Sequence, residues 1–287
     1  MKFGRKYSLS VEVAGTQNLT ITDPFSITFS IERNSLASSN TANFRIHNLG
    51  EQTRNLIYFD RFNITQLRGI QFRAGYEEFT PLVFNGTIRE AQSYRTGVDM
   101  ITEISCYDGG FGMANAFTSA AYAAGKSASE FIKDLSKNLL GGTPIVGNFP
   151  AINKRGEVIF GSTWQAIQYK SDGLAYIDNG QVRALQENEA FEGVVGEINS
   201  DTGLLGSPRR GEAMIEIEML FEPRLSVGQV LELNSSTNRI FNGRYKVMGF
   251  SHRGTISPAV SGETRTTATL WLGTQPLQIL KGAAPLQ

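Results

Sequence analysis

The sequence TGLLGSPRRGEAMIEIEML, from Thr202 to Leu220, opens the region whose pattern indicates the fold most strongly. Its second half alternates apolar residues with Glu216 and Glu218, and this period of two predicts a strand with one buried and one solvated face. The first half holds two glycines and a proline, which are typical of turns. We expect a turn that leads directly into a one-sided β-strand.

The same stretch continues to His252 with further strand and turn signals. Residues 225–230, LSVGQV, lead into a second apolar run, and Asn242-Gly243 then stands between two short apolar segments. Both central residues of a type I′ turn need positive φ, so this Asn-Gly pair predicts a tight β-hairpin. His252 follows at the expected end of a strand and is interpreted as a surface or turn residue.

The N-terminal part of the chain shows the same alternation three times, over residues 7–13, 25–31 and 42–46. Three one-sided strands within the first fifty residues predict an antiparallel barrel or sandwich. A short helix is expected from Glu51 to Tyr58, because its apolar residues lose the period of two. Strand patterns resume at residues 70–76, 82–88 and 98–107.

The middle of the chain has a different composition. Ser127 to Glu130 and Ser162 to Gln165 both have the spacing of a capping box, which predicts a helix after each serine. Asn179-Gly180 predicts a hairpin turn. Residues 111–190 therefore read as a small α+β unit placed between two β-modules.

Together these patterns predict a mainly β protein, α+β overall, with two antiparallel β-barrel-like domains joined by a small α+β insert. The expected boundaries are 1–110 for the N-terminal barrel, 111–192 for the insert and 193–275 for the C-terminal barrel. Residues 276–287 hold a proline near each end of the segment and are expected to form an extended C-terminal arm.

Composition narrows the class of protein. The chain has 287 residues, with 27 basic and 27 acidic side chains and a formal net charge of zero. A protein that binds nucleic acid without sequence preference usually carries a basic excess, and none is visible here. No apolar run approaches the ~20 residues of a membrane span, so we expect neither a signal peptide nor membrane insertion. The single cysteine, Cys106, excludes an intrachain disulfide and is expected to be buried.

Motifs for catalysis, metals and cofactors are absent from the sequence. There are two histidines, no Gly-x-Ser-x-Gly, no cysteine pair and no phosphate-binding loop. Glycoside hydrolysis needs only two carboxylates, so acidic clusters must be weighed. Glu216 and Glu218 with Glu212, and Glu187, Glu189 and Glu192 in a polar loop, are more often solvated surface than a catalytic pair. We therefore predict no catalytic, cofactor-binding or metal-binding residues, and no enzyme.

The order of motifs between residues 202 and 252 resembles the central baseplate hub proteins of contractile-tailed bacteriophages. In that family a TGLLG-x-P segment precedes a Leu-x-Val-Gly-Gln strand and a Gly-x-Tyr-x-Val hairpin that ends in His-x-Gly. A second resemblance lies between Ala42 and Leu56, where a strand is followed by Asn-Leu and then by a helix that contains Thr-Arg. This order resembles a passage near the start of many tail hub proteins. The residues that match the motifs, to which the resemblance gives a structural role, are Thr202, Gly203, Leu204, Leu205, Gly206, Pro208, Gly228, Gly243, Tyr245, Val247 and His252.

This resemblance implies a structural protein of the virion, located in the tail baseplate and assembled in the host cytoplasm. The two barrels would be similar to the tail tube subunit, so that a homotrimer forms a ring of six comparable barrels. Such a ring adapts a hexameric tail tube to a trimeric central spike. The implied partners are the tail tube protein, the central spike protein and other baseplate proteins, while genomic DNA passes through the lumen without specific binding.

Other functions stay open at the level of the sequence. A distal tail protein of a flexible-tailed phage would also be tube-like, but it would form hexamers. A tail-associated cell-wall hydrolase would need Glu216 or Glu218 as an active carboxylate. A carbohydrate-binding module would show an exposed row of aromatic side chains, whereas the strand pattern places most aromatic residues on buried faces.

Overall fold

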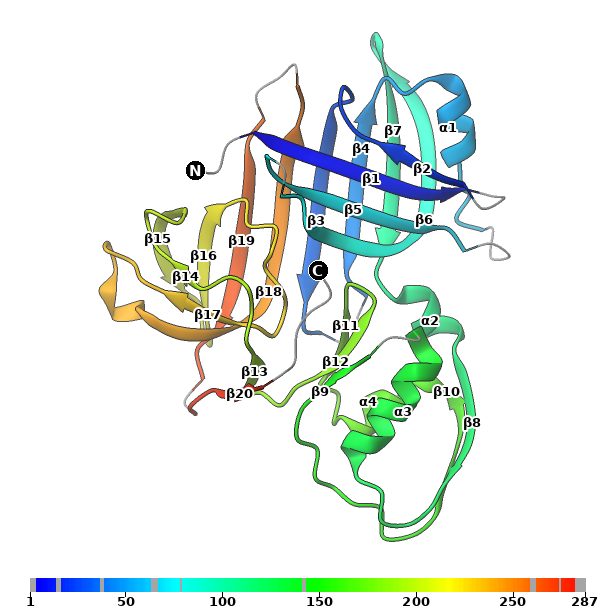
Figure 1. The fold of residues 1–287 in the computed structure, drawn as a ribbon, viewed down its shortest axis with the longest axis vertical. Coiled ribbons are helices and arrows are strands. Elements are labelled where there is room, and N and C mark those ends of the chain that lie inside the picture. The colour runs from blue at the N-terminus through cyan, green and yellow to red at the C-terminus, as the bar shows by residue number, and fades with distance from the viewer. Residues whose placement is uncertain are drawn as a thin grey trace.

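A computed structural model describes residues 4–13, 17–36, 39–62, 67–77, 79–140, 143–258, 262–273 and 275–281. Most of these residues lie in antiparallel strands, and a small helical region hangs from one end of the sheet (Figure 1). The predicted mainly β class with an α+β insert is therefore confirmed.

Among the described residues, the N-terminal part forms six strands and one short helix in the predicted order, together with a strand over residues 17–21 that the alternation did not predict. These elements are β1 (Arg5–Val13), β2 (Gln17–Ile21), β3 (Ile27–Asn34), β4 (Thr41–His47), α1 (Glu51–Ile57), β5 (Gly69–Tyr76), β6 (Leu82–Thr96) and β7 (Asp99–Tyr107). In β3 the burial alternates along the strand from Ile27, as expected for one face against the core.

The insert follows directly after β7. It contains α2 (Gly110–Asn115), β8 (Phe117–Tyr122), α3 (Ala128–Leu140), β9 (Ile145–Val146), β10 (Glu157–Ser162), α4 (Thr163–Lys170), β11 (Ala175–Asp178) and β12 (Gln181–Ala184). Both predicted helix starts are confirmed. Glu130 accepts hydrogen bonds from the backbone N–H and the hydroxyl of Ser127, at 2.7 and 2.8 Å, and Ser162 accepts one from Gln165 N–H.

The C-terminal part returns to strands. It contains β13 (Glu189–Phe191), β14 (Glu197–Ile198), β15 (Leu204–Arg210), β16 (Met214–Leu220), β17 (Val230–Leu233), the 3-10 turn η1 (Arg239–Phe241), β18 (Gly243–Ile256), β19 (Thr264–Trp271) and β20 (Gln278–Leu280). Strand β20 lies within the predicted C-terminal arm, and it pairs in parallel with β13. The described part of the arm is thus attached to the C-terminal part, and residues 282–287 lie outside the described residues.

One large sheet joins the N-terminal and C-terminal strands, which the sequence analysis placed in separate barrels. Its order is β15-β16-β19-β18-β3-β4-β7-β6-β5-β1-β2, and β14 and β17 extend it beside β18. The joint is the antiparallel pair β3–β18, which runs from Ile27 opposite Ile256 to Asn34 opposite Gly249. Among the described residues, the strand path does not return from β2 to β15, so these pairings form an open sheet and not a closed barrel.

The sheet contains the same four-stranded arrangement twice. We call β15, β16, β19 and β18 the C-terminal unit, and β3, β4, β7 and β6 the N-terminal unit. In each unit the first two strands form a hairpin and lie along the sheet in the order of the chain. The last two strands form a second hairpin, but they lie along the sheet in the reverse of their chain order. The two units repeat in one direction along the sheet, so the last strand of the C-terminal unit meets the first strand of the N-terminal unit.

The repeat extends to an irregularity in the last hairpin. The pairing of β18 with β19 shifts between Val247 and Gly249, and the pairing of β6 with β7 shifts between Ile88 and Glu90. The residue just before each bulge donates its backbone N–H to a loop carbonyl. Val247 N donates to Gln229 O, and Ile88 N donates to Arg68 O, each at 2.9 Å. A bulge at the same place in both units bends the strands alike.

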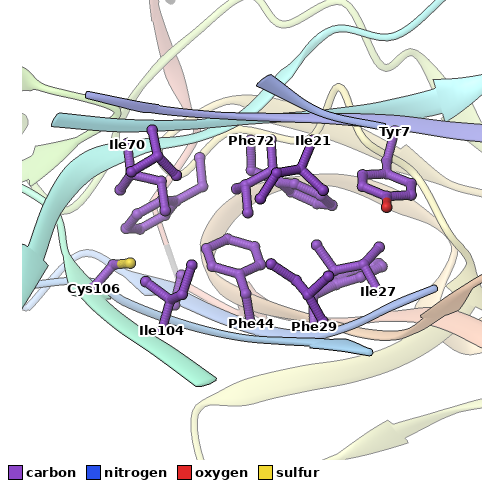
Figure 2. Close-up of a cluster of buried hydrophobic side chains, with 14 of the residues drawn as sticks. Tyr7, Ile21, Ile27, Phe29, Phe44, Ile70, Phe72, Ile104 and Cys106 are labelled. Carbon is purple, nitrogen blue, oxygen red and sulfur yellow. The ribbon is translucent and has the colours of Figure 1, made fainter. Parts of the chain in front are cut away.

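The core consists of three hydrophobic clusters. The first is built from the N-terminal strands, the second from the C-terminal strands, and the third from the helices and the β11–β12 hairpin of the insert. Figure 2 shows the first cluster, in which Phe72 points from one layer toward Phe44 and Phe29 in the other. Phe72 is fully buried, and such burial contributes about 1.5–3 kcal/mol for each large apolar side chain. Cys106 belongs to this cluster, so its predicted burial is confirmed.

Two predicted hairpins have different outcomes. Asn179 and Gly180, with φ of 52° and 73°, connect β11 to β12 in a two-residue turn, as predicted. The tight turn at Asn242-Gly243 is wrong, because Asn242 has φ of −70° and a nine-residue loop, 234–242, connects β17 to β18. The side chain of Asn242 instead accepts a hydrogen bond from Ser235 N at 2.7 Å and closes that wider loop.

Candidate functional site

The face of the sheet that points away from the first two hydrophobic clusters is polar across both units. It is called the polar face below. Its side chains, in strand order, are Glu216 and Glu218 (β16), Arg265, Thr267 and Thr269 (β19), Ser251, Arg253 and Thr255 (β18), Thr28, Ser30 and Glu32 (β3), Asn43 and Arg45 (β4), and Glu103 and Ser105 (β7). A shallow depression of about 380 Å³ lies over β3, β4 and β7, lined by Ser30, Arg45 and Glu103 among others.

Three arginines on the polar face each pair with a glutamate. Arg45 lies 3.0 Å from Glu103, Arg253 lies 2.8 Å from Glu32, and Arg265 pairs with Glu218. All three pairs connect neighbouring strands on the same face. Because each of these three cations has an anion beside it, the described pairs add little net charge that would hold a passing polyanion.

Hydroxyl groups cross the joint between the two units. Thr28 on β3 lies 3.0 Å from Thr255 on β18, measured between the hydroxyl oxygens, and Ser26 lies 2.6 Å from Ser257 just beyond the strands. The backbone ladder and these side-chain hydrogen bonds make the joint continuous with the sheets on either side.

A buried ion cluster connects the insert to both units. Its side chains come from β3, β11 and β12, and Figure 1 shows the β11–β12 hairpin beside the lower end of β3. Asp178 at the end of β11 pairs with Arg33 from β3 and with Arg183 from β12, the latter at 2.5 Å, and all three side chains are at most 1% exposed. Arg33 also donates to Val83 O at 2.9 Å, and Arg183 donates to Val227 O at 2.7 Å. The cluster thus reaches the N-terminal unit through Arg33 and the C-terminal part through Val227.

The β11–β12 turn is held by hydrogen bonds to N-terminal residues. Asn40 donates to Ile177 O at 2.8 Å, Asp108 accepts from Gly180 N at 2.8 Å, and Asn179 accepts from Asn85 N at 3.1 Å. Burial, together with the nearby Asp178 carboxylate, raises the pKa of Asp108 to about 7. The turn is therefore fixed in position by buried polar contacts.

His252 does not lie at the surface, and its interpretation as a surface or turn residue is wrong. It is fully buried within β18, and its Nδ1 lies 2.8 Å from the Thr266 hydroxyl. The rings of Phe221 and Phe250 lie against it, at centroid distances of 5.2 and 4.7 Å. Burial first, and then the charge of Arg33, holds the pKa of His252 well below its usual range. The strand continues past it to Ile256, which the alternation alone did not reveal.

The TGLLG motif forms the turn before β15 and the first part of that strand. Asn199 N donates to the Thr202 hydroxyl at 2.7 Å, and Gly203 has φ of 116°, which favours glycine. Leu204 packs against the second hydrophobic cluster and Leu205 is half-buried. Gly206 and the buried Pro208 lie where the pairing of β15 with β16 is interrupted.

The other motif residues surround the start of β18. Gly228 has φ of 88°, and a Cβ there would lie 2.3 Å from the Tyr176 hydroxyl of the insert. Gly243 begins β18, the Tyr245 hydroxyl donates to Phe241 O at 2.9 Å, and Val247 is buried in the second cluster. The motif residues therefore lie in two places, one at the outer edge of the sheet and one near the insert.

The acidic clusters are placed as follows. Glu216 and Glu218 share the open polar face, as predicted, and Glu212 is exposed in the turn before β16. In the other cluster Glu187 and Glu192 are exposed, but Glu189 is buried. Glu189 accepts backbone hydrogen bonds from Asn148 and Gln186, at 2.8 and 2.9 Å, which anchors the loop before β13.

Within the described ranges, no group of three histidine, cysteine, aspartate or glutamate side chains could hold a metal ion. The described helices include none that is long and apolar enough to cross a membrane.

The buried cluster of Arg33, Asp178 and Arg183 was missed by sequence reasoning. Arg33 stands at the end of an alternating strand, where a charged residue is usually solvated. The one available signal was the Asp178-Asn179-Gly180 turn with Arg183 close behind it. That signal predicts the hairpin but says nothing about Arg33, which is 145 residues away from Asp178.

Comparisons with known proteins agree with this arrangement. A family model described as baseplate hub gp41 matches residues 8–253. No curated protein sequence matches the chain.

Solved structures share the fold at low sequence identity. A tail protein from Neisseria meningitidis MC58 has a TM-score of 0.59 and 12% identity, over 94% of this chain and 97% of that one. A 43 kDa tail protein of prophage MuSo2 from Shewanella oneidensis has a TM-score of 0.61 and 8% identity, over 92% and 96%. An Escherichia coli component of the type VI secretion system, described as similar to bacteriophage T4 tail proteins, has a TM-score of 0.56 and 9% identity, over 93% and 78%.

Proposed function

We propose, from the premise that this chain belongs to the baseplate hub gp41 family, that three copies form a ring that adapts the tail tube to the central spike. As a member of that family the chain is a structural hub protein of the bacteriophage tail baseplate, and so a component of the virion tail. It associates with other tail proteins. The trimer, the tube protein and the spike protein as specific partners are our proposal, as is assembly in the host cytoplasm.

One observation carries the proposal, namely that both units contribute strands to one sheet with one polar face. The N-terminal and C-terminal units have the same strand order and point the same way along the sheet. A threefold ring of such chains would present six similar units, which matches a sixfold tube on one side, while the chain itself keeps threefold symmetry for a spike. Symmetry conversion follows from having two units in one chain.

The polar face suits a channel for DNA. Its side chains are mainly Ser, Thr and paired Arg and Glu, and Arg45, Arg253 and Arg265 all have carboxylate partners. Unpaired cations would bind phosphates and release counterions, which favours retention of the DNA. We propose that this face lines the lumen and lets genomic DNA pass without specific binding.

The division into a tube-like domain at 1–110, an insert at 111–192, a tube-like domain at 193–275 and an arm at 276–287 is also proposed. The three hydrophobic clusters support it, because each draws most of its residues from one of these ranges. In this scheme the motif residues have structural roles, with Gly228 at the contact between insert and C-terminal domain and Thr202 to Pro208 at the edge of the sheet.

A purely structural role without enzymatic activity is proposed as well. Glu216 and Glu218 lie on an open sheet, and Glu218 is paired with Arg265, which gives neither carboxylate the apolar enclosure of a general acid. A zymogram against purified cell wall should show no clearing. Clearing that disappears in Glu216→Gln or Glu218→Gln would replace this proposal with a hydrolase.

The solution mass by light scattering, over a concentration series, tests the ring. We expect three times the chain mass of 31.5 kDa at high concentration. A mass of six chains would favour the distal tail protein of a flexible-tailed phage. A monomer at every concentration, both alone and mixed with the spike protein of the same virion, would contradict the trimeric hub.

A further inference from the structure

The joint between the two units inside one chain shows how one unit can attach to the next. Strand β18 is long because its two halves have different neighbours. Residues Gly243–Lys246 pair with β17, and residues Gly249–Ile256 pair with β3, while β19 lies along the other side. The second half of β18, after its bulge, is thus the place where the next unit joins.

Strand β6 is built in the same way at the other end of the two units. Its first half, residues 82–87, pairs with β5, and the pairing with β7 shifts at Arg89, in the same place as the shift in β18. Beyond the bulge, Ala91 exchanges 2.9 Å hydrogen bonds with Phe59. From Gln92 to Thr96, β7 is the one strand that pairs with β6 among the described residues. The outer side of this segment corresponds to the side of β18 that β3 covers.

Strand β15 is the matching free edge. It is the first strand of the C-terminal unit, as β3 is of the N-terminal unit, and within the described chain it pairs with β16 alone. Gly206 with φ of 65° and Pro208 interrupt it. Proline and bulges are common on edge strands, where they prevent unspecific pairing while leaving a specific partner possible.

We infer that β15 of one copy pairs antiparallel with Gln92–Thr96 of β6 in the next copy, so that the β3–β18 joint recurs between chains. This inference rests on the proposed ring and names the surfaces that close it. The register follows from the internal joint, where Ser30 lies opposite Arg253 and Ile31 opposite His252. Counted from the common bulge, Arg253 and His252 of β18 are equivalent to Tyr94 and Ser93 of β6. The pairing of β15 with β16 makes Arg209 and Arg210 equivalent to Ser30 and Ile31 of β3, so the expected pairs are Arg209 opposite Tyr94 and Arg210 opposite Ser93.

The side chains at these two edges fit one another. Arg209 and Arg210 are exposed on β15, and on the other edge the Tyr94 hydroxyl donates to Glu103 at 3.3 Å. Arg209 of the incoming strand would lie beside Tyr94 and close to the Glu103 carboxylate, as Arg253 lies beside Glu32 in the internal joint. The two edges are different surfaces, so the contact is head to tail and can close into a ring.

The test is a disulfide across the inferred joint, with Tyr94→Cys and Arg209→Cys in one chain. Directly opposed residues of an antiparallel pair have Cβ atoms about 4.5–5.5 Å apart, close enough for oxidation after a small shift. We expect mild oxidation to give covalent dimers and trimers on a non-reducing gel, at least tenfold more than either single variant. An intrachain bond is excluded because six strands separate β6 from β15 in the sheet. Cys106 is buried and does not compete.

A control pair and a second variant sharpen the test. In the control pair, Tyr94→Cys with Glu216→Cys, the second thiol lies on β16, opposite Arg209 and one strand away from the inferred joint. This pair should form at least tenfold less disulfide between chains than Tyr94→Cys with Arg209→Cys. The backbone N–H and C=O of Ala91 point toward the outer side of β6, where they bond to Phe59. The direction of these groups alternates along a strand, so those of Arg95, four residues later, point to the outer side as well. Arg95→Pro should therefore weaken assembly at least tenfold, whereas Arg95→Ala should assemble normally.

The outcomes separate this inference from the proposed function. A sample of the Tyr94→Cys, Arg209→Cys variant that has the mass of a trimer but forms no disulfide between chains overturns the joint and leaves the ring. A ladder of covalent species that continues beyond three chains supports the joint and overturns the trimer. A sample that stays monomeric at every concentration and does not cross-link overturns both.

Discussion

The two units of the sheet share their backbone plan but differ in the residues at equivalent positions. Each has the same strand order and the same bulge, and each places a polar pair in its last hairpin. In the N-terminal unit that pair is Ser93 and Thr102, 2.9 Å apart, and in the C-terminal unit it is His252 and Thr266, 2.8 Å apart. His252 is covered by Ile31 of β3, whereas Ser93 lies near the uncovered end of β6.

The backbone hydrogen-bond geometry is thus what repeats between the two units, whereas the side chains at equivalent positions differ because the neighbours of each unit differ. The C-terminal unit has β3 on one side and contacts the insert. Its residue His252 is therefore large and buried, whereas the equivalent Ser93 of the N-terminal unit is small. The predictions below test where the two units behave alike and where their neighbours separate them.

The largest effect is expected from Asp178→Ala, which removes the carboxylate that ties the insert to both units. Arg33 and Arg183 would be left buried without their anion, and such a loss costs about 3–5 kcal/mol. Urea unfolding measures it as a fall in the midpoint. Glu103→Ala, which breaks a half-exposed pair on the polar face, should cost less than about 1 kcal/mol. Equal losses in the two variants would contradict the importance of the buried cluster.

A second comparison concerns two glycines with positive φ, one in the loop before β17 and one in the N-terminal unit. Gly228→Ala should cost about 2–4 kcal/mol, because the left-handed backbone is strained with a Cβ and the new methyl would meet the Tyr176 hydroxyl at 2.3 Å. Gly97→Ala, in the β6–β7 turn with φ of 62° and open space around it, should cost about 1–2 kcal/mol. Thermal unfolding compares them, and a smaller loss for Gly228→Ala would contradict the close contact with the insert.

Asp108→Asn should alter how stability depends on pH. The pKa of Asp108 is raised to about 7, so between pH 4 and 7 the folded chain holds a proton that the unfolded chain has released. Stability from this group therefore falls as pH rises through that window. We expect the variant to be more stable than the parent by about 4 kcal/mol at pH 8, and nearly equal to it at pH 4. Asp201→Asn, at an exposed turn, is the control, and an Asp108→Asn curve parallel to the parent would contradict this reading.

The smallest effect is expected from His252→Ser. This change gives the C-terminal unit a serine at the position where the N-terminal unit has Ser93. The pKa of His252 is lowered in the folded chain, so below pH 6.5 the unfolded chain binds a proton that the buried ring does not. The parent should lose up to about 1 kcal/mol per pH unit below pH 6.5 through this group. The serine variant should lack that part of the slope, although its cavity lowers stability at pH 7. His47→Ser retains His252 and should keep the slope; if both variants keep it, the assignment to His252 is wrong.

Much of the fold follows from local patterns. The alternation in β3 and β16 needs only that one face of a strand be dry, and the capping box at Ser127 needs only four adjacent residues. The resemblance of residues 202–252 and 42–56 to the hub family was also readable in the sequence, and the match to residues 8–253 confirms it.

The two wrong interpretations have one cause, since each depended on a contact beyond the immediate neighbours of the residue in the chain. His252 is buried because β3 covers β18, and Asn242 shapes a wide loop because Ser235 donates to its side chain. Neither fact can be read from the neighbouring residues, where His-Arg-Gly and Asn-Gly are equally common in exposed turns.

Local patterns in the sequence predict most of the strands, the insert and the family, because these depend on period, caps and motifs carried by adjacent residues. Contacts between distant segments determine that two modules become one sheet, that Arg33 meets Asp178, and that β15 and the end of β6 are left as edges. Strand pairing satisfies backbone groups that every residue carries, so the side chains specify which face of a strand is buried but not which distant strand lies beside it.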